Sequence, residues 1–405
     1  MPTAEPVVRA LFFLLPSLLC HGALYAWAMR AFPKLAARRR LVRVVFGVLV
    51  FLMPVSRLVA YRVHSAPIRA LTAFAMAELL VALIALVPLF LLRMGVHFSH
   101  HVKPATSADP PRPPETTAAD APPAPRFSRR EAFERAAGIA VVGSSAGAIG
   151  WGVVRGRLDF QIEEVVVRIP GLPKTLEGYT IAQVSDIHVG MFVDERELAQ
   201  GLSLVARTKP DLVVATGDLV DFDPRYVALM ARSLGDLRAR DGVAAILGNH
   251  DYYTDGAAVR DGLLRAGVRA LVNEHVVLRP RDGAGIVLAG VDDYSGKHYR
   301  DGGGGPNLTR TLAGAPEDAP RILLAHQPQY FSDAQGRIAL QLSGHVHGGQ
   351  VNPIVHPARY LLRYVAGRYE GAGSTMWVNR GFGTAGPPAR LGAPPEITRV
   401  VLVSA

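Results

Sequence analysis

The chain has 405 residues, of which 49% are hydrophobic, and a mean hydropathy of +0.20. This composition is more apolar than that of most soluble enzymes, and it predicts membrane segments within two or three domains. The single cysteine, Cys20, excludes a disulfide within the chain and a metal site made of cysteines. The formal net charge of +10 reflects arginines that cluster beside apolar segments, a pattern typical of membrane topology and not of a nucleic-acid-binding surface.

The first part of the chain is predicted to form membrane helices. Residues 1–96 contain three apolar stretches, each of which reaches the ~20 residues that cross a bilayer. A Pro- and Ala-rich linker is predicted over residues 97–127, and a fourth apolar stretch lies within residues 128–156. Ser-Arg-Arg precedes the fourth stretch and resembles a twin-arginine export signal; the alternative is a plain membrane helix with cytoplasmic arginines. The four stretches are 7–31, 41–61, 68–92 and 136–154.

Positive charge predicts how these helices are oriented. The segments 33–43 and 93–135 are rich in arginine, whereas the connection over residues 62–69 carries fewer positive charges. Because basic loops stay on the cytoplasmic side, both basic segments are expected inside and everything after residue 155 outside. We therefore expect a multi-pass protein of the cell membrane with an extracytoplasmic C-terminal domain.

One acidic residue, Glu78, lies within the predicted spans. Ionisable groups are costly inside a bilayer and are functional candidates by default. Pairing with Arg57 or His21, or a position near water, explains this residue equally well, so we assign it no role.

Strands and helices alternate over residues 157–405. Early alternation of the two element types, followed mostly by strands, predicts an α/β fold: a four-layer α/β sandwich of two mixed β-sheets flanked by helices. Strands are expected at 159–169, 180–185, 212–216, 244–247, 276–278, 286–289, 322–325, 340–343, 376–379 and 398–403, and helices at 195–207, 224–238 and 256–266.

Five of the apolar runs in this domain end at residue types that bind metals. The last of them leads into Gly-His-Val-His-Gly-Gly, in which two imidazoles lie two residues apart between glycines. Residues i and i+2 share a side of an extended chain, and neutral imidazole is a common metal ligand. Because α/β folds place ligands just past the carboxyl ends of strands, we expect one site. The motifs, in chain order, are Asp186-x-His188, Gly217-Asp218, Gly248-Asn249-His250-Asp251, His326 and His345-x-His347.

Each of these residues also has an ordinary structural explanation. Asp218 could cap a helix, Asn249 could fill a turn, and His326 could be a hydrogen-bonded histidine of the core. All such explanations would have to hold together, in the same order along the chain, for the pattern to be a coincidence. We therefore favour the metal site.

The complete pattern, in this order, resembles that of the calcineurin-like metallophosphoesterases, from about residue 181 to the C-terminus. Gly-His-Val-His-Gly-Gly-Gln and the tail over residues 379–397 look like the membrane-associated bacterial phosphodiesterase branch. The resemblance implies two divalent metal ions, and ligands that mix carboxylate, imidazole and amide oxygen suit Mn, Fe or Zn. It implies Asp186, His188 and His347 as ligands of one ion, Asn249, His326 and His345 as ligands of the other, and Asp218 as a bridge between both.

The same resemblance gives His250 and Asp251 a catalytic role. His250 would not bind metal but would donate to a phosphate oxygen or protonate the leaving group, and Asp251 would orient it through a hydrogen bond. The nucleophile would be a metal-bound hydroxide, since two ions can acidify a water and stabilise both the attacking and the leaving group.

Other polar residues match no ligand motif. Arg380 and Arg390 could meet substrate phosphate or form structural pairs, and the two explanations are equally supported. Four aspartates are predicted to be helix caps and turn residues: Asp221, Asp223, Asp292 and Asp293.

Together these features predict a membrane-anchored hydrolase acting on ester bonds: a binuclear-metal phosphoesterase, with a phosphodiester as the favoured substrate. Its expected partners are a phosphate-ester or lipid-phosphate substrate and the membrane. One alternative is a pyrophosphatase for a nucleotide-linked lipid at the bilayer, which the membrane helices favour. The other is a non-catalytic envelope protein that binds metal; a missing ligand would favour it, and no ligand of the pattern is missing.

Overall fold

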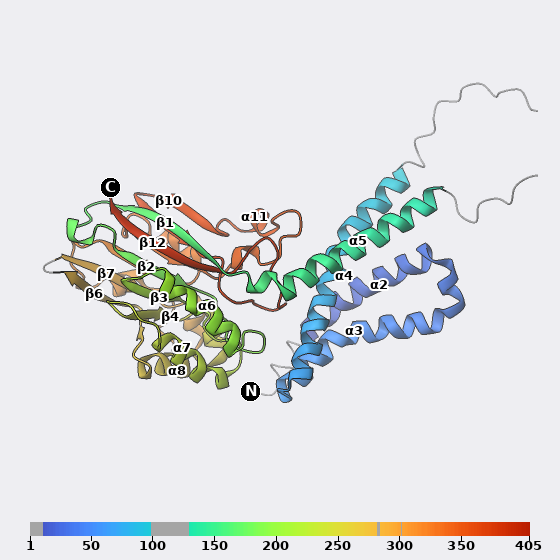
Figure 1. Cartoon of the computed structure of the whole chain (residues 1–405), viewed down its shortest axis with the longest axis horizontal. Helices are drawn as coiled ribbons and strands as arrows, with labels where there is room; N and C mark the ends of the chain where they lie inside the picture. The colour runs from blue at the N-terminus through green and yellow to red at the C-terminus, as the bar shows by residue number, and fades with distance from the viewer. Residues whose placement is uncertain (1–10, 99–128, 282–283, 301) are drawn as a thin grey trace, which may run out of the picture. The chain divides into compact units, whose positions relative to one another are not determined.

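The computed structural model describes residues 11–98, 129–281, 284–300 and 302–405. The chain forms two compact units, Met1–Gly150 and Trp151–Ala405. Figure 1 shows long helices in the first unit and two sheets with helices in the second. The linker predicted over residues 97–127 lies outside the described residues, apart from its first two positions.

Long apolar helices build the N-terminal unit. Among the described residues, three segments are long and apolar enough to cross a membrane: Pro33–Arg62, Ala66–Gly95 and Glu131–Leu158. The first predicted span begins outside the described residues, and its described part forms helix α2. The helices are α2 (Leu14–Ala31), α3 (Arg39–Arg62), α4 (Ala66–Phe98) and α5 (Arg129–Val154), which continues into the second unit.

A hydrogen-bonded pair lies inside the N-terminal unit. The Nε2 atom of His21 is 2.9 Å from a carboxylate oxygen of Glu78, and its Nδ1 atom is 2.7 Å from the carbonyl oxygen of Ser17. His21 is only 1% exposed and Glu78 is partly exposed, so the pair joins α2 to α4 with its histidine buried. Buried ionisable groups are tolerated when they are paired in this way. Of the pairings considered for Glu78, the structure shows the one with His21.

Two six-stranded sheets build the C-terminal unit. The first has the strand order β1-β12-β2-β3-β4-β5, and the second has the order β10-β11-β9-β8-β7-β6. Each sheet contains both parallel and antiparallel pairs, so both are mixed, as predicted. The strands are β1 (Gln161–Ile169), β2 (Thr180–Val184), β3 (Leu212–Thr216), β4 (Val243–Ile246), β5 (Arg269–Ala270), β6 (Glu274–Arg281), β7 (Ala284–Gly290), β8 (Arg321–Leu324), β9 (Leu340–Ser343), β10 (Gly367–Gly371), β11 (Ser374–Val378) and β12 (Glu396–Ser404).

Alternation along the strands explains why both faces of the first sheet are covered. In β3, Leu212 and Val214 join the apolar core between the two sheets, whereas Val213 and Ala215 join the core beneath the helices. Successive side chains of a strand point to opposite faces, so one apolar run contributes to two cores. This is why the run has no polar residue at alternate positions.

Helices cover the outer faces of both sheets. Those on the first sheet are α6 (Glu195–Arg207), α7 (Val227–Gly235) and α8 (Asn249–Arg265) (Figure 1). The short helices α9 (Leu308–Thr311) and α10 (Phe331–Ala334) contribute Leu308 and Ala334 to a core on the second sheet. The predicted four-layer α/β sandwich is therefore confirmed.

One boundary that differs from the prediction positions part of the site. Helix α8 begins at Asn249 and is kinked at Asp255, so the helix predicted from residue 256 corresponds to its second part. The earlier start is capped by the carboxylate of Asp251, which accepts a hydrogen bond from the backbone N–H of Gly248 at 2.8 Å. This start places Asn249 and His250 on the first helical turn, just past the end of β4. Strands β5 and β10 were not predicted, since β5 has two residues and β10 lacks an apolar run.

Candidate metal centre

The carboxyl ends of five strands meet at one edge of the C-terminal unit. These strands are β2, β3 and β4 of the first sheet and β8 and β9 of the second. Each of the seven predicted ligands follows its strand within four residues, and the contacts below bring all seven together. The edge therefore collects polar side chains that lie far apart in the sequence, as the carboxyl ends of α/β sheets typically do.

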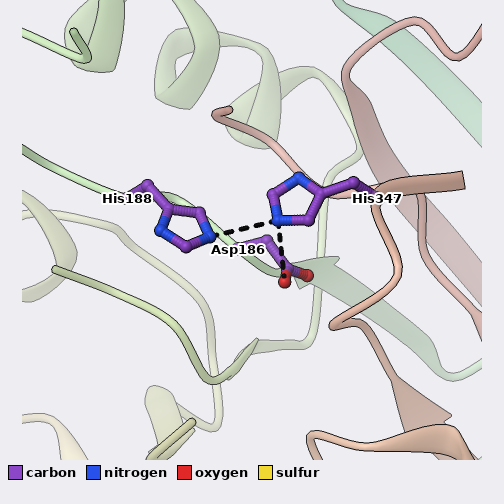
Figure 2. Close-up of side chains that lie close together, drawn as sticks. All are labelled: Asp186, His188 and His347. Carbon is purple, nitrogen blue, oxygen red and sulfur yellow. Dashed lines mark hydrogen bonds and ion pairs between the residues drawn. The ribbon is translucent and has the colours of Figure 1, made fainter. Parts of the chain in front are cut away.

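The first group consists of Asp186, His188 and His347. The Nε2 atoms of His188 and His347 are 3.1 Å apart, and Nε2 of His347 lies 3.4 Å from Oδ1 of Asp186 (Figure 2). All three side chains are buried, and one ligand atom from each lies within 4.8 Å of the others. One carboxylate with two imidazoles suits a divalent transition metal.

The second group surrounds His326. Its Nε2 atom lies 3.2 Å from Oδ2 of Asp218, 3.3 Å from Nδ1 of His345 and 3.3 Å from the side-chain oxygen of Asn249. The Nδ1 atom of His326 is 2.8 Å from the carbonyl oxygen of Thr216, to which it donates. A neutral ring that donates from Nδ1 leaves Nε2 free to bind a metal, so this backbone contact orients the ring as a ligand.

Asp218 lies between the two groups. Besides its contact with His326, its Oδ2 atom lies 3.7 Å from Nε2 of His188, a member of the first group. Its Oδ1 atom accepts a hydrogen bond from the backbone N–H of His250 at 2.8 Å. The residue is 2% exposed. This is the place that a carboxylate shared by two metal ions would take.

The backbone of the site is strained at its ligands. Residues other than glycine seldom adopt a positive φ, and each such residue costs roughly 1–3 kcal/mol. Strain of this kind persists only where the surrounding structure enforces it, and its concentration at one edge marks a functional site. Five of the seven predicted ligands have a positive φ: Asp186 (52°), His188 (52°), Asp218 (53°), His345 (75°) and His347 (53°).

Two motif glycines allow the backbone to approach the buried carboxylates. A Cβ atom on Gly344 would overlap the carboxylate of Asp186, and a Cβ atom on Gly248 would overlap that of Asp218. Both positions therefore require glycine. Because Gly344 has no side chain, the backbone N–H of His345 can donate to Oδ1 of Asp186 at 2.9 Å.

The partner that orients His250 is Asp221 and not Asp251. The Nδ1 atom of His250 is 2.9 Å from Oδ1 of Asp221, and the same oxygen lies 3.6 Å from Nδ1 of His188. The predicted hydrogen bond between Asp251 and His250 is wrong. The carboxylate of Asp251 instead accepts hydrogen bonds from backbone N–H groups and so holds the start of α8 against the loop that follows Asp218. The predicted role of Asp221 as a cap or turn residue is also wrong, because its carboxylate contacts the rings of His250 and His188. The backbone N–H donors to Asp251 are those of Leu219, Val220 and Gly248.

Two aromatic residues beside His250 also escaped the sequence analysis. The ring of Phe222 lies 4.6 Å from that of His250, centroid to centroid, and the ring of Tyr253 lies 5.5 Å from it.

One signal in the sequence could have drawn attention to Asp221. This residue lies three positions after Asp218, on the loop that carries Asp218 over the edge of the sheet. A second carboxylate at that short spacing has the reach to contact the same set of imidazoles.

The two arginines left open by the sequence pair within the protein, and a guanidinium nitrogen of Arg390 also lies 3.2 Å from Nδ1 of the predicted ligand His347. Arg390 is buried and donates to the carbonyl oxygens of Gly383, Arg380 and Ala393. Arg380 pairs with Glu163 at 3.1 Å and with Glu396 at 2.9 Å. Three of the four aspartates behave as predicted caps or turn residues, accepting from nearby backbone N–H groups: Asp223, Asp292 and Asp293.

The electrostatics of the site favour the ligand forms of Asp218 and His347. Burial by itself raises the pKa of Asp218, but His326, His250 and His188 hold that pKa well below its usual value. Burial lowers the pKa of His347, and His188 and Arg390 lower it further. The carboxylate is therefore ionised and the imidazole of His347 neutral near pH 7, and these are the protonation states that bind metals. Burial by itself lowers the pKa of His326, but Asp218 raises it well above its usual value, so a cation bound there would displace a proton from this ring.

The donor set fits divalent cations on its own geometry. The buried Nδ1 atom of His188 has no hydrogen-bond partner among the described residues. Its Nε2 atom faces Nε2 of His347, and two ring nitrogens that face each other can share at most one proton. A cation between the two Nε2 atoms and Asp186 would relieve this crowding of nitrogens, and Nδ1 of His188 would then donate toward Oδ1 of Asp221, which lies 3.6 Å away.

Known proteins are similar to this chain in sequence. Residues 179–349 match the family described as Calcineurin-like phosphoesterase. A protein of Bacillus subtilis (strain 168), named "Uncharacterized metallophosphoesterase YkuE", is 32% identical over 290 residues, which are 69% of this chain and 99% of that protein. The chain belongs to the calcineurin-like phosphoesterase family.

Two further relatives extend the comparison. A Danio rerio protein named "Transmembrane protein with metallophosphoesterase domain" is 37% identical over 262 residues, which are 63% of this chain and 60% of that protein. An Aquifex aeolicus (strain VF5) protein named "Uncharacterized metallophosphoesterase" is 34% identical over 246 residues, or 60% and 91% of the two chains. The chain thus spans 60% of the length of the Danio rerio relative.

Replacing Asp218 tests the metal centre directly. Asp218→Ala removes the carboxylate that touches both groups, so we expect metal affinity to fall by at least ~10–100-fold, the loss typical of a mutated outer-shell partner. The measurement is the metal content of the purified full chain after dialysis against graded metal concentrations, determined by mass spectrometry. The matched control is Asp236→Ala, an exposed aspartate at the end of α7. Equal metal content in both variants would contradict the assignment.

Proposed function

We propose that this phosphoesterase is a membrane-anchored, binuclear-metal enzyme that hydrolyses phosphodiesters. Asp186, His188 and His347 would hold one ion, Asn249, His326 and His345 the other, and Asp218 would bridge them. The observation that carries the proposal is the position of the Asp218 carboxylate, whose Oδ2 atom lies 3.7 Å from His188 and 3.2 Å from His326. When bound, such ions polarise phosphate oxygens and acidify the attacking water.

His250 supplies a proton in this proposal. Its ring stands edge-on to that of His188, with centroids 4.6 Å apart, and so borders the first group of ligands. Burial by itself lowers the pKa of His250, but Asp218, Asp221 and Asp251 raise it above its usual value. With Nδ1 engaged by Asp221, the Nε2 atom is the one that donates to a phosphate oxygen or to the leaving group.

Asp221 and Asp251 have different parts in this arrangement. Asp221 contacts the ring of His250 and sets its orientation and pKa. Asp251 holds the backbone on which Asp218 and Asn249 are mounted, so it positions ligands without touching the proton donor. The phosphodiester preference is supported by the likeness of the Gly-His-Val-His-Gly-Gly-Gln motif to the phosphodiesterase branch.

We also propose that residues 1–96 and 128–156 are membrane segments, that residues 97–127 link them, and that residues 157–405 form an extracytoplasmic catalytic domain. Three segments long and apolar enough to cross a membrane support the anchoring. The excess of arginine in alternate connections supports the orientation.

Metal-dependent turnover tests the enzymatic proposal. The full chain, freed of metal and then given Mn, Fe, Zn or Mg in turn, is expected to hydrolyse a chromogenic phosphodiester faster than its monoester. His250→Ala should lower kcat/KM by about 10²–10⁴-fold, the usual contribution of a general acid, while metal content stays unchanged. His298→Ala serves as the matched control, since His298 belongs to neither ligand group. Bound metal without turnover of either substrate would refute the proposal.

The pH profile tests the role of Asp221. The negative charge of Asp221 raises the pKa of His250, so Asp221→Asn lowers that pKa. Activity that needs protonated His250 is lost as pH rises through this pKa, and the alkaline limb of kcat/KM should therefore move to lower pH. Asp223→Asn is the control. A uniform loss of activity with an unmoved limb would show that Asp221 is merely structural.

A reporter fusion tests the orientation. Because everything after residue 155 is expected outside, alkaline phosphatase fused after Ala405 should be active, and green fluorescent protein at the same position should stay dark after export through the general secretory route. The matched control places the same reporters within the basic segment 33–43, where the opposite result is expected. Fluorescence at the C-terminus would reverse the topology.

A further inference from the structure

An exposed apolar segment lies directly after the metal-ligand loop. Residues 353–363, here called the apolar lobe, follow His347 and include helix α11 (Ala358–Leu361) (Figure 1). Of the twelve large hydrophobic residues that are exposed in the described part of residues 151–405, five lie within 354–362. Exposed apolar side chains gathered in one short segment point to an interaction site. The most exposed side chains are Ile354 (91%), Leu361 (83%) and Tyr360 (80%).

The lobe is fixed at both of its ends, first to the ligand loop and then to a buried cluster beside α10. Before it, the buried side chain of Asn352 donates to the carbonyl oxygen of Gly348 at 3.0 Å. After it, the ring of Tyr364 packs edge-on against Phe331 in a buried cluster. The apolar side chains are therefore displayed at a defined place relative to His347, and their exposure is not that of a loose chain end.

The charge of the lobe suits an anionic surface. Arg359 and Arg363 are exposed on it, and the chain has no acidic residue between Asp333 and Glu370. In Arg-Tyr-Leu-Leu-Arg, the two arginines flank three apolar side chains, as in segments that lie at a lipid interface. Protein–protein interfaces are also rich in Arg and Tyr, so the choice of a bilayer over a second copy rests on the membrane-length segment that ends directly before the catalytic unit.

The chain keeps this unit close to a bilayer. A segment that is long and apolar enough to cross a membrane ends at Leu158, and β1 begins at Gln161. An extended chain spans at most ~3.6 Å per residue, so the start of β1 stays within about 10 Å of the end of that segment. A lipid surface is therefore always within reach of the catalytic unit.

We propose that the apolar lobe inserts into the headgroup region of the bilayer and that the metal centre hydrolyses a phosphoester of a lipid held there. The inference rests on the phosphoesterase function proposed above and names its substrate class. Interfacial segments enter by about 5–10 Å, which holds the site at the depth of lipid phosphates. A bond forms between water oxygen and phosphorus, the bond from phosphorus to the leaving oxygen breaks, and one water proton ends on that oxygen.

Probe depth tests the insertion without any measurement of catalysis. In the full chain carrying Cys20→Ser, Leu361→Cys is labelled with nitrobenzoxadiazole and reconstituted into vesicles of phosphatidylglycerol and phosphatidylethanolamine. Nitroxide-labelled lipid is expected to quench this probe and aqueous iodide to leave it bright. The matched control is Leu264→Cys, an exposed leucine at the end of α8, for which the reverse is expected.

Two results overturn the insertion. Equal quenching by iodide at positions 361 and 264, without quenching by nitroxide lipid, shows that the lobe lies in water. Protection of position 361 from both quenchers shows that protein covers the lobe, as association with a second copy would. Both readings hold whether or not the protein hydrolyses any phosphoester.

Activity tests the substrate class. We compare kcat/KM for a fluorescent phosphodiester lipid in these vesicles with kcat/KM for a soluble chromogenic diester. The ratio should fall about tenfold in a variant with Tyr360→Ser and Leu361→Ser, since two apolar anchors are lost, and stay constant in Leu264→Ser. An unchanged ratio overturns the lipid substrate. If the unmodified protein hydrolyses neither substrate, the proposed phosphoesterase function is overturned. The probe-depth measurement still tests the insertion of the lobe in that case.

Discussion

The ionised carboxylate of Asp218 is the constraint around which the metal centre is built. Burying such a charge costs several kcal/mol unless it is compensated, and here imidazoles of both ligand groups and the backbone N–H of His250 compensate it. Gly248 must stay without a side chain to leave room for it. Charge compensation at one carboxylate therefore draws together motifs that the sequence spreads over more than a hundred residues.

Each ligand group draws on both sheets, so the centre depends on the core between them. The first group joins residues after β2 and β9, and the second joins residues after β3, β4, β8 and β9. Leu212, Val214, Leu324 and Leu342 lie in the apolar core that sets the distance between these strands. A change of volume there moves the two halves of the site relative to each other, because protein interiors are close-packed and transmit strain.

Local signals allowed much of this to be predicted from the sequence. The helix Glu195–Arg207 and the strands Leu212–Thr216 and Leu340–Ser343 have the predicted bounds, since their periodicity is strong and turn residues follow. The partner of His250 was missed because Asp221 belongs to no motif and meets the ring only through the turn after Asp218. The burial of Arg390 depends on carbonyl groups gathered by the fold, which no local pattern displays.

The position of β12 has a consequence for biosynthesis. This strand, Glu396–Ser404, lies between β1 and β2 and pairs with both. Until the ribosome has passed Ser404, β2 has an open edge and β1 has no neighbour in the sheet, and open strand edges invite mispairing. The first sheet of the catalytic unit can therefore form completely only after β12 has been synthesised. A nascent chain that stalls before residue 396 contains every ligand motif but lacks the strand that joins β1 to β2.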